Sequence, residues 1–458
     1  MHPDIHRRNR MSDHYDVIVA GAGIGGLCAA LRAREKGASV AIIEKAETIG
    51  GSAAASGGTI WCAKNIDEWL KVQPNGDTAL GTALIDRFDT GIEWLRKQGV
   101  SLQAREDKPY KFQRTIYQFT PDARTAMEIL GYQFQHRGGT ILTHTGLTGL
   151  IGGNGKPITG VRTTHTEITA RSVILSTGGY QANPKLRAQY FGAESDHMIV
   201  RGVPQNTGGG FQSALEAGAQ STGPLNRFYG HLLPAPPARV GLHNFLKVKP
   251  DFSEYAILIN LKGQRFDDEY LGDEVTCHTL VQQPQATAIL IFDQHIRDNQ
   301  NALSQWPTPD NDRVKNIREA GGEVIETSSL PELTRALTNR WHIPAHTFEK
   351  TMAEYATACA TGNGQTLSIP KTGGLIPLNT PPYYAIRTRP GITFTYGGAK
   401  VNAQAQVLNK NDHPIPGLYA AGADCGGIYT RGYTGGLCMG LAYGLIAGEG
   451  AAKYATLK

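Results

Sequence analysis

The stretch that decides the fold lies near the start of the chain and reads "YDVIVAGAGIGGLCAALRAREKGASVAIIEK", residues 15–45. A short apolar run of strand type leads into Gly21, Gly23 and Gly26, which have G-x-G-x-x-G spacing. An alanine- and leucine-rich helical segment follows, and a second apolar run ends at Glu44. A strand, a glycine turn, a helix and a second strand in this order predict a Rossmann-like α/β domain.

Each residue of this motif has a physical task. Gly21 permits a tight turn, and Gly23 lets the backbone approach a pyrophosphate. Gly26 allows the helix to pack closely on the strand, and the helix N-terminus offers free N–H groups to phosphates. Glu44 can accept hydrogen bonds from a ribose hydroxyl. The motif therefore predicts a dinucleotide site, but it does not separate NAD from FAD.

The composition favours a globular protein of two lobes. The chain has 458 residues, 40% of them hydrophobic, and its formal net charge is only +5. This length exceeds one ordinary domain. Lysines and arginines do not form a run interleaved with aromatic residues, so we expect no nucleic-acid partner. No apolar run approaches membrane-spanning length, so we expect no membrane span.

Cysteine usage and the first residues suggest a compartment. The six cysteines contain no CxxC pair and no zinc-like pairing with histidine, which favours reduced thiols and predicts no metal site. The opening holds paired arginines without an apolar stretch behind them, which argues against a secretory signal. We therefore expect a cytoplasmic protein with a disordered lead-in over residues 1–13.

Four glycine-rich motifs narrow the cofactor to FAD. The segment "IGGSAAASGGTIW", residues 49–61, is too rich in glycine and serine for a packed helix. It resembles the second pyrophosphate- and flavin-contacting loop of the succinate dehydrogenase/fumarate reductase flavoprotein superfamily. Three more motifs follow in that family's order: "VILSTGGYQANP" (173–184), "NTGGGFQSALEAGA" (206–219) and "IPGLYAAGAD" (415–424). The resemblance covers nearly the whole chain and implies FAD as the cofactor.

The resemblance also implies which residues hold FAD. Asp424 stands at the place of the acid that holds the ribityl chain, where glutamate is commoner. Residues 52–56 contain no histidine, the residue by which covalent members attach their flavin, so we expect noncovalent FAD. The expected cofactor contacts are Gly21, Gly23, Gly25, Gly26, Glu44, Lys45, Gly51, Ser52, Ser56, Gly57, Gly58, Thr177, Gly178, Gly179, Gly422, Asp424, Gly436 and Leu437.

The domain organisation follows from where these motifs stop. Between about residues 234 and 380, helical patterns and polar segments replace the glycine motifs. The resemblance implies a mobile α+β capping domain at 234–380, inserted into a glutathione-reductase-type FAD-binding domain at 14–233 and 381–458. Within "LINLKGQRFDDE" near the expected cap hinge, Arg265 and Glu269 are expected to form a structural ion pair.

Three positions distinguish the chain from enzymes that bind dicarboxylates. Asp273, four residues after Glu269, stands where those enzymes carry a proton-delivering arginine. Thr393 and Phe394 stand at the place of a histidine pair, and Tyr433 at that of a late substrate arginine. Because the carboxylates of a buried substrate need cationic partners, we do not expect fumarate or succinate as the substrate.

The remaining resemblance is to the ketosteroid dehydrogenase branch, whose members desaturate a carbon–carbon bond next to a ketone. It rests on the serine-rich loop up to Trp61 and on "RGYTGGLCMG", residues 431–440. In that branch a tyrosine hydroxyl and a backbone N–H polarise the ketone oxygen. The resemblance implies that Tyr433 fills the first role and that Gly436 or Leu437 supplies the N–H.

A second tyrosine then takes the α-proton, and the β-hydrogen leaves as hydride to flavin N5. Tyr270 and Tyr117 are the two candidates for this base. Phe394 and Arg431 are expected to contact the substrate, and Arg431 would suit a carboxylate on a small cyclic keto acid. We expect a helix over residues 437–453, with its N-terminus facing the flavin.

Alternatives of other classes remain at this point. One is an ene-reductase or a tricarballylate-type polycarboxylate dehydrogenase of the same fold, with Arg431, Arg201 or Arg387 binding a carboxylate. The other is a flavin-binding redox partner or sensor without catalysis. The leading hypothesis is an FAD-dependent ketone desaturase with an unidentified electron acceptor.

Overall fold

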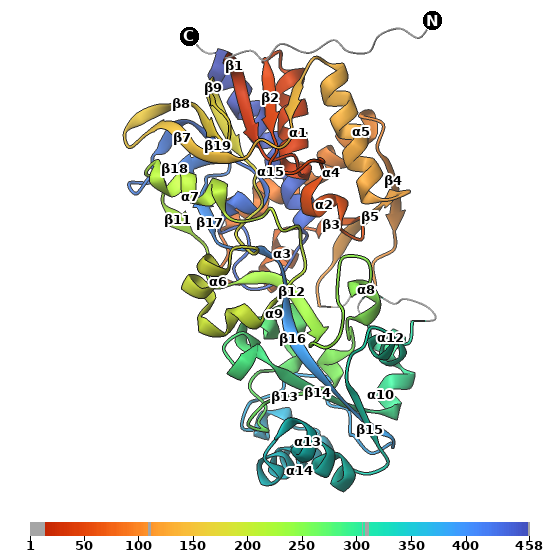
Figure 1. Ribbon diagram of the computed structural model, residues 1–458. Helices are drawn as coiled ribbons and strands as arrows, with labels where there is room; N and C mark the ends of the chain where they lie inside the picture. The colour runs from red at the N-terminus through yellow and green to blue at the C-terminus, as the bar shows by residue number, and fades with distance from the viewer. Residues whose placement is uncertain (1–13, 109–110, 305, 307–310, 457–458) are drawn as a thin grey trace, which may run out of the picture. The chain divides into compact units, whose positions relative to one another are not determined.

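The computed structural model describes residues 14–108, 111–304, 306 and 311–456 (Figure 1). The predicted lead-in at 1–13 lies outside these residues. The chain divides into two compact units, and each is considered separately. The first comprises the described residues within 1–183, 203–225 and 394–458, and the second comprises those within 184–202 and 226–393.

The first unit is built on a mostly parallel sheet with the strand order β18-β19-β9-β1-β2-β6, extended by the antiparallel strands β8 and β7. The strands are β1 (His14–Ala20), β2 (Val40–Ile43), β6 (Thr140–Leu142), β7 (Leu147–Gly153), β8 (Lys156–Thr163), β9 (Glu167–Leu175), β18 (Gln406–Leu408) and β19 (Pro414–Ala420). The central strands are nearly continuous apolar runs because helices and connections cover both faces of a parallel sheet. The predicted Rossmann-like α/β domain is confirmed.

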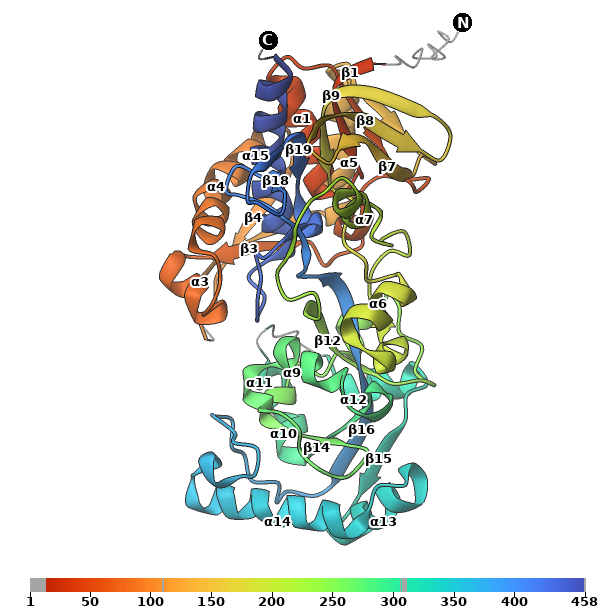
Figure 2. The same cartoon turned by 90° about the vertical axis from the view of Figure 1, so that its left-hand side faces the viewer.

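The α-helices of the first unit are α1 (Ile24–Glu35), α2 (Gly51–Ala54), α3 (Ile66–Val72), α4 (Thr78–Lys97), α5 (Ala123–His136), α7 (Gly209–Glu216) and α15 (Gly436–Thr456), and of these α1 and α15 contact the central strands of the sheet. Helix α15 lies beside α1 although the two are far apart in the chain (Figure 2). A Cβ at Gly448 would lie 2.4 Å from the carbonyl oxygen of Ala29, so only glycine allows this close approach. The helix expected at 437–453 is confirmed and is slightly longer.

Two small sheets complete the first unit. One has the order β3-β5-β4 and the other β11-β17-β20. Their strands are β3 (Thr59–Ala63), β4 (Ser101–Arg105), β5 (Arg114–Thr120), β11 (Ser221–Thr222), β17 (Gly398–Lys400) and β20 (Cys425–Gly426). Through β3 and β20, these sheets hold the ends of two glycine-rich motifs in place.

The second unit contains a sheet with the order β10-β16-β14-β13, in which β12 and β15 also pair with β16. Its strands are β10 (Ile199–Val200), β12 (Phe228–Pro234), β13 (Ile257–Asn260), β14 (Ala288–Asp293), β15 (Val324–Thr327) and β16 (Tyr383–Thr395). Its α-helices are α6 (Pro184–Phe191), α8 (Phe245–Val248), α9 (Asp273–Leu280), α10 (Gln294–Asp298), α11 (Gln300–Leu303), α12 (Arg313–Glu319), α13 (Leu330–Trp341) and α14 (Ala345–Thr361). This mixture matches the predicted α+β insertion.

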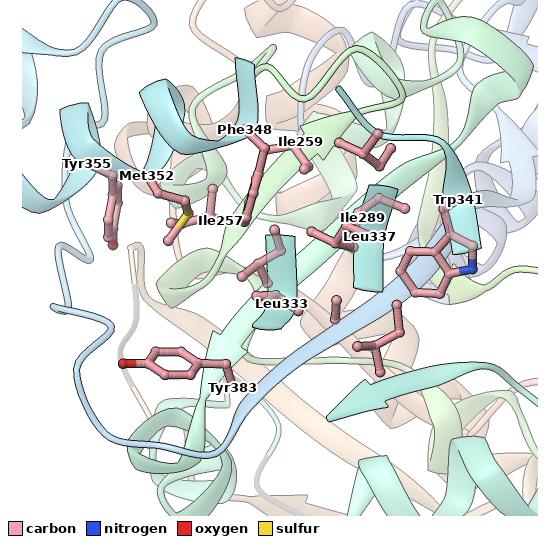
Figure 3. Close-up of a cluster of buried hydrophobic side chains, with 14 of the residues drawn as sticks. Ile257, Ile259, Ile289, Leu333, Leu337, Trp341, Phe348, Met352, Tyr355 and Tyr383 are labelled. Atoms are coloured by element: carbon pink, nitrogen blue, oxygen red, sulfur yellow. The ribbon is translucent and has the colours of Figure 1, made fainter. Parts of the chain in front are cut away.

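The second unit has a hydrophobic core of its own. Figure 3 shows side chains of α13 and α14 meeting apolar residues of β13 and β14. In α13, Leu333, Leu337 and Trp341 recur at helical spacing and point to this core. A separate core is what allows a segment inserted into another domain to fold as a compact unit.

The boundaries of the two units differ from the predicted ones at 233/234 and 380/381. Residues 184–202, 226–233 and 381–393 pack with the second unit. The physical reason is strand pairing, because β12 and most of β16 belong to the sheet of the second unit. Glycine motifs mark the ends of strands in the first unit, but they do not show which sheet a neighbouring strand joins.

Candidate active site and FAD cradle

Glycine-rich turns meet at the start of α1. The backbone of Gly21 has a φ of +102°, and a Cβ there would lie 2.2 Å from the carbonyl oxygen of Ser176. Gly23, at the N-cap of α1, forms an isolated parallel bridge with Gly50, and no side chain caps the helix. The first N–H groups of α1 therefore remain available, beside the loop that contains Gly51, for a phosphate.

The acid of the dinucleotide motif is held firmly at the end of β2. The two carboxylate oxygens of Glu44 accept hydrogen bonds from the backbone N–H groups of Ala22, at 2.8 Å, and Ala46, at 2.7 Å. A carboxylate has about four lone-pair positions, so it retains capacity for ribose hydroxyls. Lys45 donates to the hydroxyl of Thr207 over 2.9 Å.

The serine-rich loop differs in one respect from its predicted form. Residues 51–54 make a single helical turn, α2, where we expected no packed helix. Gly50, with a φ of +105°, turns the chain into it. The Ser52 hydroxyl accepts a hydrogen bond from Asn206 at 3.2 Å. Further on, the Ser56 hydroxyl caps the turn, because it donates to a backbone carbonyl and accepts from the N–H of Gly58.

The last two motifs meet at Asp424, which is fully buried. Its carboxylate accepts hydrogen bonds from the backbone N–H of Thr177 and from the Thr177 hydroxyl. The same hydroxyl accepts the N–H of Gly210 at 3.0 Å. Burial raises the pKa of Asp424 to about 6, although the hydrogen bonds from Thr177 oppose this shift. Gly178 and Gly179 follow with φ values of +89° and +77°.

The arrangement fits FAD. Segments from four separate parts of the chain, around Gly21, Gly51, Thr177 and Asp424, lie together within the first unit. Open helix N-termini, backbone turns without side chains and two anchored carboxylates are groups that a pyrophosphate, a ribose and a ribityl chain require. Gly57, Gly58 and Gly422 belong to the same loops, and Gly58 and Gly422 have positive φ values.

Tyr433 lies just before the N-terminus of α15. The backbone N–H of Gly436 donates to the Tyr433 hydroxyl oxygen over 2.7 Å. Tyr433 is only 9% exposed, so its ring position is fixed. The sequence resemblance implied that the Tyr433 hydroxyl and the N–H of Gly436 both donate to a ketone oxygen. In the structure the N–H of Gly436 donates to the Tyr433 oxygen itself.

Aromatic rings surround Tyr433. The ring of Trp61 lies edge-on at 5.2 Å between centroids, and the rings of Tyr429 and Phe394 lie at 6.0 and 6.1 Å. Phe394 also restricts Gly436, where a Cβ would lie 2.8 Å from the ring. The surroundings of Tyr433 in the first unit are therefore largely apolar, and Phe394 is one of the rings beside it.

Tyr117 points away from this group. In the antiparallel pair β3–β5, Trp61 lies opposite Ile116, and Tyr117 lies opposite Ile60. Opposite residues share a face, and successive residues alternate between faces. Since Trp61 contacts Tyr433, Tyr117 lies on the other face, where its ring packs with Phe88 and Arg96 of α4. The structure does not bring Tyr117 together with Tyr433.

Tyr270 belongs to the second unit, in the 3-10 turn Glu269–Leu271. Its ring packs on Gly373 and Gly374, and a Cβ at Gly373 would lie 2.4 Å from the ring. The ring of Tyr255 lies 6.3 Å away. Tyr270 as the base stays a prediction.

Comparison with known proteins identifies the family of this chain. A sequence profile described as an FAD binding domain matches residues 16–437. The chain belongs to this FAD-binding family. FAD is therefore its cofactor, as the four motifs predicted.

The sequence relatives within the family include both reductases and a dehydrogenase. The chain is 28% identical to the NADH:fumarate oxidoreductase of Klebsiella pneumoniae (strain 342), over 96% of the chain but 48% of that protein. It is 27% identical to the vinyl phenol reductase of Lactiplantibacillus plantarum (strain ATCC BAA-793 / NCIMB 8826 / WCFS1), over 96% and 97%. It is 24% identical to the 4-oxocyclohexanecarboxylate 2-dehydrogenase of Sinomonas cyclohexanicum, over 95% and 92%. The chain spans about half of the first relative and nearly all of the other two.

The fold of the family has been solved. The 3-ketosteroid Δ1-dehydrogenase from Sterolibacterium denitrificans superposes with a TM-score of 0.77 at 20% identity, over 96% of this chain and all of that one. This likeness shows the fold, which is the one that the resemblance implied. The FAD-binding family and the relatives within it make the chain an FAD-dependent oxidoreductase.

The predicted structural ion pair of the second unit is confirmed. Arg265 and Glu269 lie 2.6 Å apart with both side chains buried, and Lys371 approaches the same carboxylate to 3.3 Å. The three candidate carboxylate-binding arginines belong to different segments of the chain. Arg431 is exposed in the first unit, and Arg387, in the second, lies 3.6 Å from Glu323.

The third candidate, Arg201, lies over the rings of Tyr229 and Phe245 in the second unit, at 5.2 and 4.3 Å.

Sequence reasoning missed two features that the structure shows. One is Gln73, which no motif marks. The other is Tyr229 with His231, which the alternation of strand residues could have placed on one face.

Two further observations concern metal ions and membranes. In the part of the chain that the structure describes, no group of three or more His, Cys, Asp or Glu side chains is arranged to hold a metal ion. Among the helices with described residues, none is both long and apolar enough to cross a membrane.

Proposed function

We propose that this flavoprotein desaturates the carbon–carbon bond next to a ketone, and that the Tyr433 hydroxyl holds the ketone oxygen. The observation that carries the proposal is the 2.7 Å hydrogen bond from the N–H of Gly436 to the Tyr433 oxygen. With that oxygen already accepting a hydrogen bond, the hydroxyl proton is directed elsewhere, and a ketone oxygen is a fitting acceptor.

The N–H of Gly436 makes the tyrosine a better donor. Donation to the phenol oxygen polarises the O–H bond, and hydrogen bonds in a chain strengthen one another. Gly436 opens α15, so the positive end of the helix dipole acts on the same hydroxyl. A strong hydrogen bond to the ketone stabilises enolate character as the α-proton leaves.

The rings around Tyr433 favour an apolar ring as substrate. Trp61 and Phe394 flank the hydroxyl, and both present hydrocarbon rather than charge. A substrate carboxylate placed beside these rings would lose its hydration without gaining a cationic partner. A cyclohexanone-type ring or the first ring of a ketosteroid meets these requirements, in keeping with the oxocyclohexane relative.

Bound FAD supplies the hydride chemistry at the β-carbon. The residues of the chain bind and polarise the ketone, exclude water from the Tyr433 hydroxyl and accept the α-proton. Tyr270 and Tyr117 are the candidates for the proton acceptor from sequence. Tyr117 is disfavoured because it lies on the face of β5 that packs against α4, away from Tyr433.

A second candidate function is the reverse reaction, reduction of a polarised C=C bond. The observation that favours it is that the fumarate and vinyl phenol relatives, at 28% and 27% identity, are named as reductases. A residue that polarises a carbonyl lowers the barrier in both directions, so the same geometry serves either reaction.

Anaerobic mixing tests the proposal. The oxidised enzyme is mixed with cyclohexanone, 4-oxocyclohexanecarboxylate or a 3-ketosteroid, and the reduced enzyme with fumarate or 4-vinylphenol, while flavin absorbance is followed. We expect a saturated ketone to bleach the flavin. Tyr433→Phe should retain FAD but bleach about 100-fold more slowly, which is typical of losing one oxyanion donor. Reaction with fumarate or vinylphenol alone, or full activity in Tyr433→Phe, contradicts the proposal.

A further inference from the structure

Arg114 is a buried arginine of β5 in the first unit, and it lies on the same face of its sheet as Trp61. Trp61 pairs with Ile116 across β3 and β5, and Arg114 stands two residues before Ile116, so its side chain shares that face. The Arg114 side chain is only 1% exposed. Its guanidinium carbon lies 5.3 Å from the centroid of the Trp61 ring. A cation in this place attracts the face of the indole.

A carboxylate fixes the guanidinium in this position. Nε and Nη2 of Arg114 donate to one oxygen of Asp107 over 3.0 and 2.7 Å, and the backbone N–H of Arg114 donates to the other oxygen over 2.9 Å. The planar guanidinium cannot turn without breaking a charge-assisted hydrogen bond. Because Asp107 also neutralises the positive charge, Arg114 acts on Trp61 mainly at short range, by packing and by attraction to the ring.

Phe112 adds to the support of the indole. Its ring lies 5.9 Å from the ring of Trp61, and the Arg114 guanidinium lies 5.6 Å from the Phe112 ring. Trp61 and Phe112 are 5% and 8% exposed. The indole is thus packed against two buried neighbours of β5 and of the segment before it.

Trp61 passes this support on to Tyr433. The two rings lie 5.2 Å apart between centroids, and their planes are nearly perpendicular at 89°. The backbone carbonyl of Trp61 also lies against the turn that follows Tyr433, since a Cβ at Gly435 would come within 2.0 Å of it. One residue therefore contacts both the ring of the tyrosine and the backbone behind it, and all of these groups belong to the first unit.

We propose that Arg114 is a positioning residue of this enzyme: it holds Trp61 against Tyr433 and so fixes the direction of the Tyr433 hydroxyl. The proposal rests on the proposed function for the group that this hydroxyl binds. A phenol ring that tilts takes its hydroxyl out of line with the ketone oxygen. Stabilisation of enolate character depends on that alignment, so a small displacement far from the reacting atoms slows the reaction.

Saturation kinetics of flavin bleaching test the proposal. Arg114→Met keeps a side chain of similar reach but removes the guanidinium. With a saturated ketone under anaerobic conditions, we expect the limiting bleaching rate to fall about 10-fold, while the ketone concentration at half this rate and the FAD content change little. Arg114→Lys keeps a cation beside Asp107, which protects the fold, but lysine has no planar fork to lie on the indole. We expect it to slow bleaching about threefold. Wild-type rates in both variants overturn the proposal.

The same change in a Tyr433→Phe background separates positioning from general damage. If Arg114 acts through the tyrosine hydroxyl, Arg114→Met should slow the Tyr433→Phe enzyme no further, because the group that it aligns is gone. Arg32→Met is the matched control, since Arg32 forms ion pairs with Glu35 and Glu449 at 2.8 and 2.7 Å in the same unit. It should not slow bleaching. An equal slowing in both backgrounds, or the same slowing in Arg32→Met, overturns the proposal.

Fluorine NMR provides a readout without substrate. The FAD-loaded protein is labelled with 5-fluorotryptophan, and the signal of Trp61 is identified by its loss in Trp61→Phe. We expect Arg114→Met to shift and broaden this signal while the signal of Trp94, which donates to Glu35 over 2.9 Å, stays in place. An unchanged Trp61 signal overturns the proposal whatever the substrate is. If no saturated ketone bleaches the wild type but the Trp61 signal moves, the proposed function fails and the support of Trp61 by Arg114 stands.

Discussion

The side chain of Gln73 holds the backbone that leads into Tyr433: its Nε2 donates to the carbonyl of Gly432 over 2.6 Å. Its Oε1 accepts the backbone N–H groups of Thr430 and Arg431 at 2.8 and 3.0 Å. Gln73 caps the C-terminus of α3 and is fully buried. One amide thus fixes three consecutive residues just before the tyrosine that we propose binds the ketone.

Gln73→Ala should therefore loosen Tyr433 as well as destabilise the fold. Each buried backbone group left without a partner costs about 1–3 kcal/mol. We expect the free energy of unfolding, measured in urea, to fall by about 3 kcal/mol, and ketone-induced bleaching to slow while FAD stays bound. Gln113→Ala, at an exposed position of the same unit, is the matched control. Equal stability and equal bleaching rates in the two variants would show that the hydrogen bonds of Gln73 do not hold Tyr433 in place.

Gly435→Ala tests the turn into α15. Gly435 has a φ of +108°, and a Cβ would lie 2.0 Å from the carbonyl oxygen of Trp61. Gly155 has a φ of +90° but faces open space, so Gly155→Ala measures the backbone strain alone, about 1–2 kcal/mol. We expect Gly435→Ala to lose clearly more stability and to bleach slowly with a ketone. Similar thermal melting of the two variants would mean that the contact with Trp61 relaxes at no cost.

Glu254→Gln tests a buried acid of the second unit through its pH dependence. Burial, followed by the charges of Asp273 and Glu274, raises the pKa of Glu254 to about 9. The folded state thus binds a proton that the unfolded state releases near pH 4.5, and wild-type stability is lost as pH rises toward 9. The variant cannot ionise, so it should exceed the wild type by a few kcal/mol at pH 8 and by little at pH 4.

Urea unfolding at these two pH values measures the difference. Glu319→Gln, at an exposed position of α12, should show no such change between pH 4 and pH 8. A stability difference for Glu254→Gln that is the same at both pH values would contradict a raised pKa.

Acid precipitation tests how FAD is held. The loop from Ser52 to Ser56 contains no histidine, and its two hydroxyls bond within the protein. We expect all the yellow chromophore to remain in the supernatant when the protein is precipitated. A yellow pellet after washing would show a covalent bond and would require an attachment residue elsewhere in the chain.

The sequence by itself determined the local architecture of this protein. Gly21, Gly23 and Gly26 together with two apolar runs gave β1, α1 and β2, because turn chemistry and periodicity act between residues close in the chain. The other glycine motifs led to FAD through their resemblance to a known flavoprotein superfamily, because each motif is a short segment that can be recognised along the chain.

Only the tertiary structure decided which side chains meet. Gln73 and Gly432 are 359 residues apart in the chain, and His231 and Asp273 are 42 apart. Sheet register, which reverses the face of every side chain when it shifts by one residue, turned Tyr117 away from Tyr433. Strand pairing likewise decided the boundaries of the two units, because β12 and most of β16 join the sheet of the second unit. Such contacts depend on how separate elements pack, and no local pattern of residues encodes that packing.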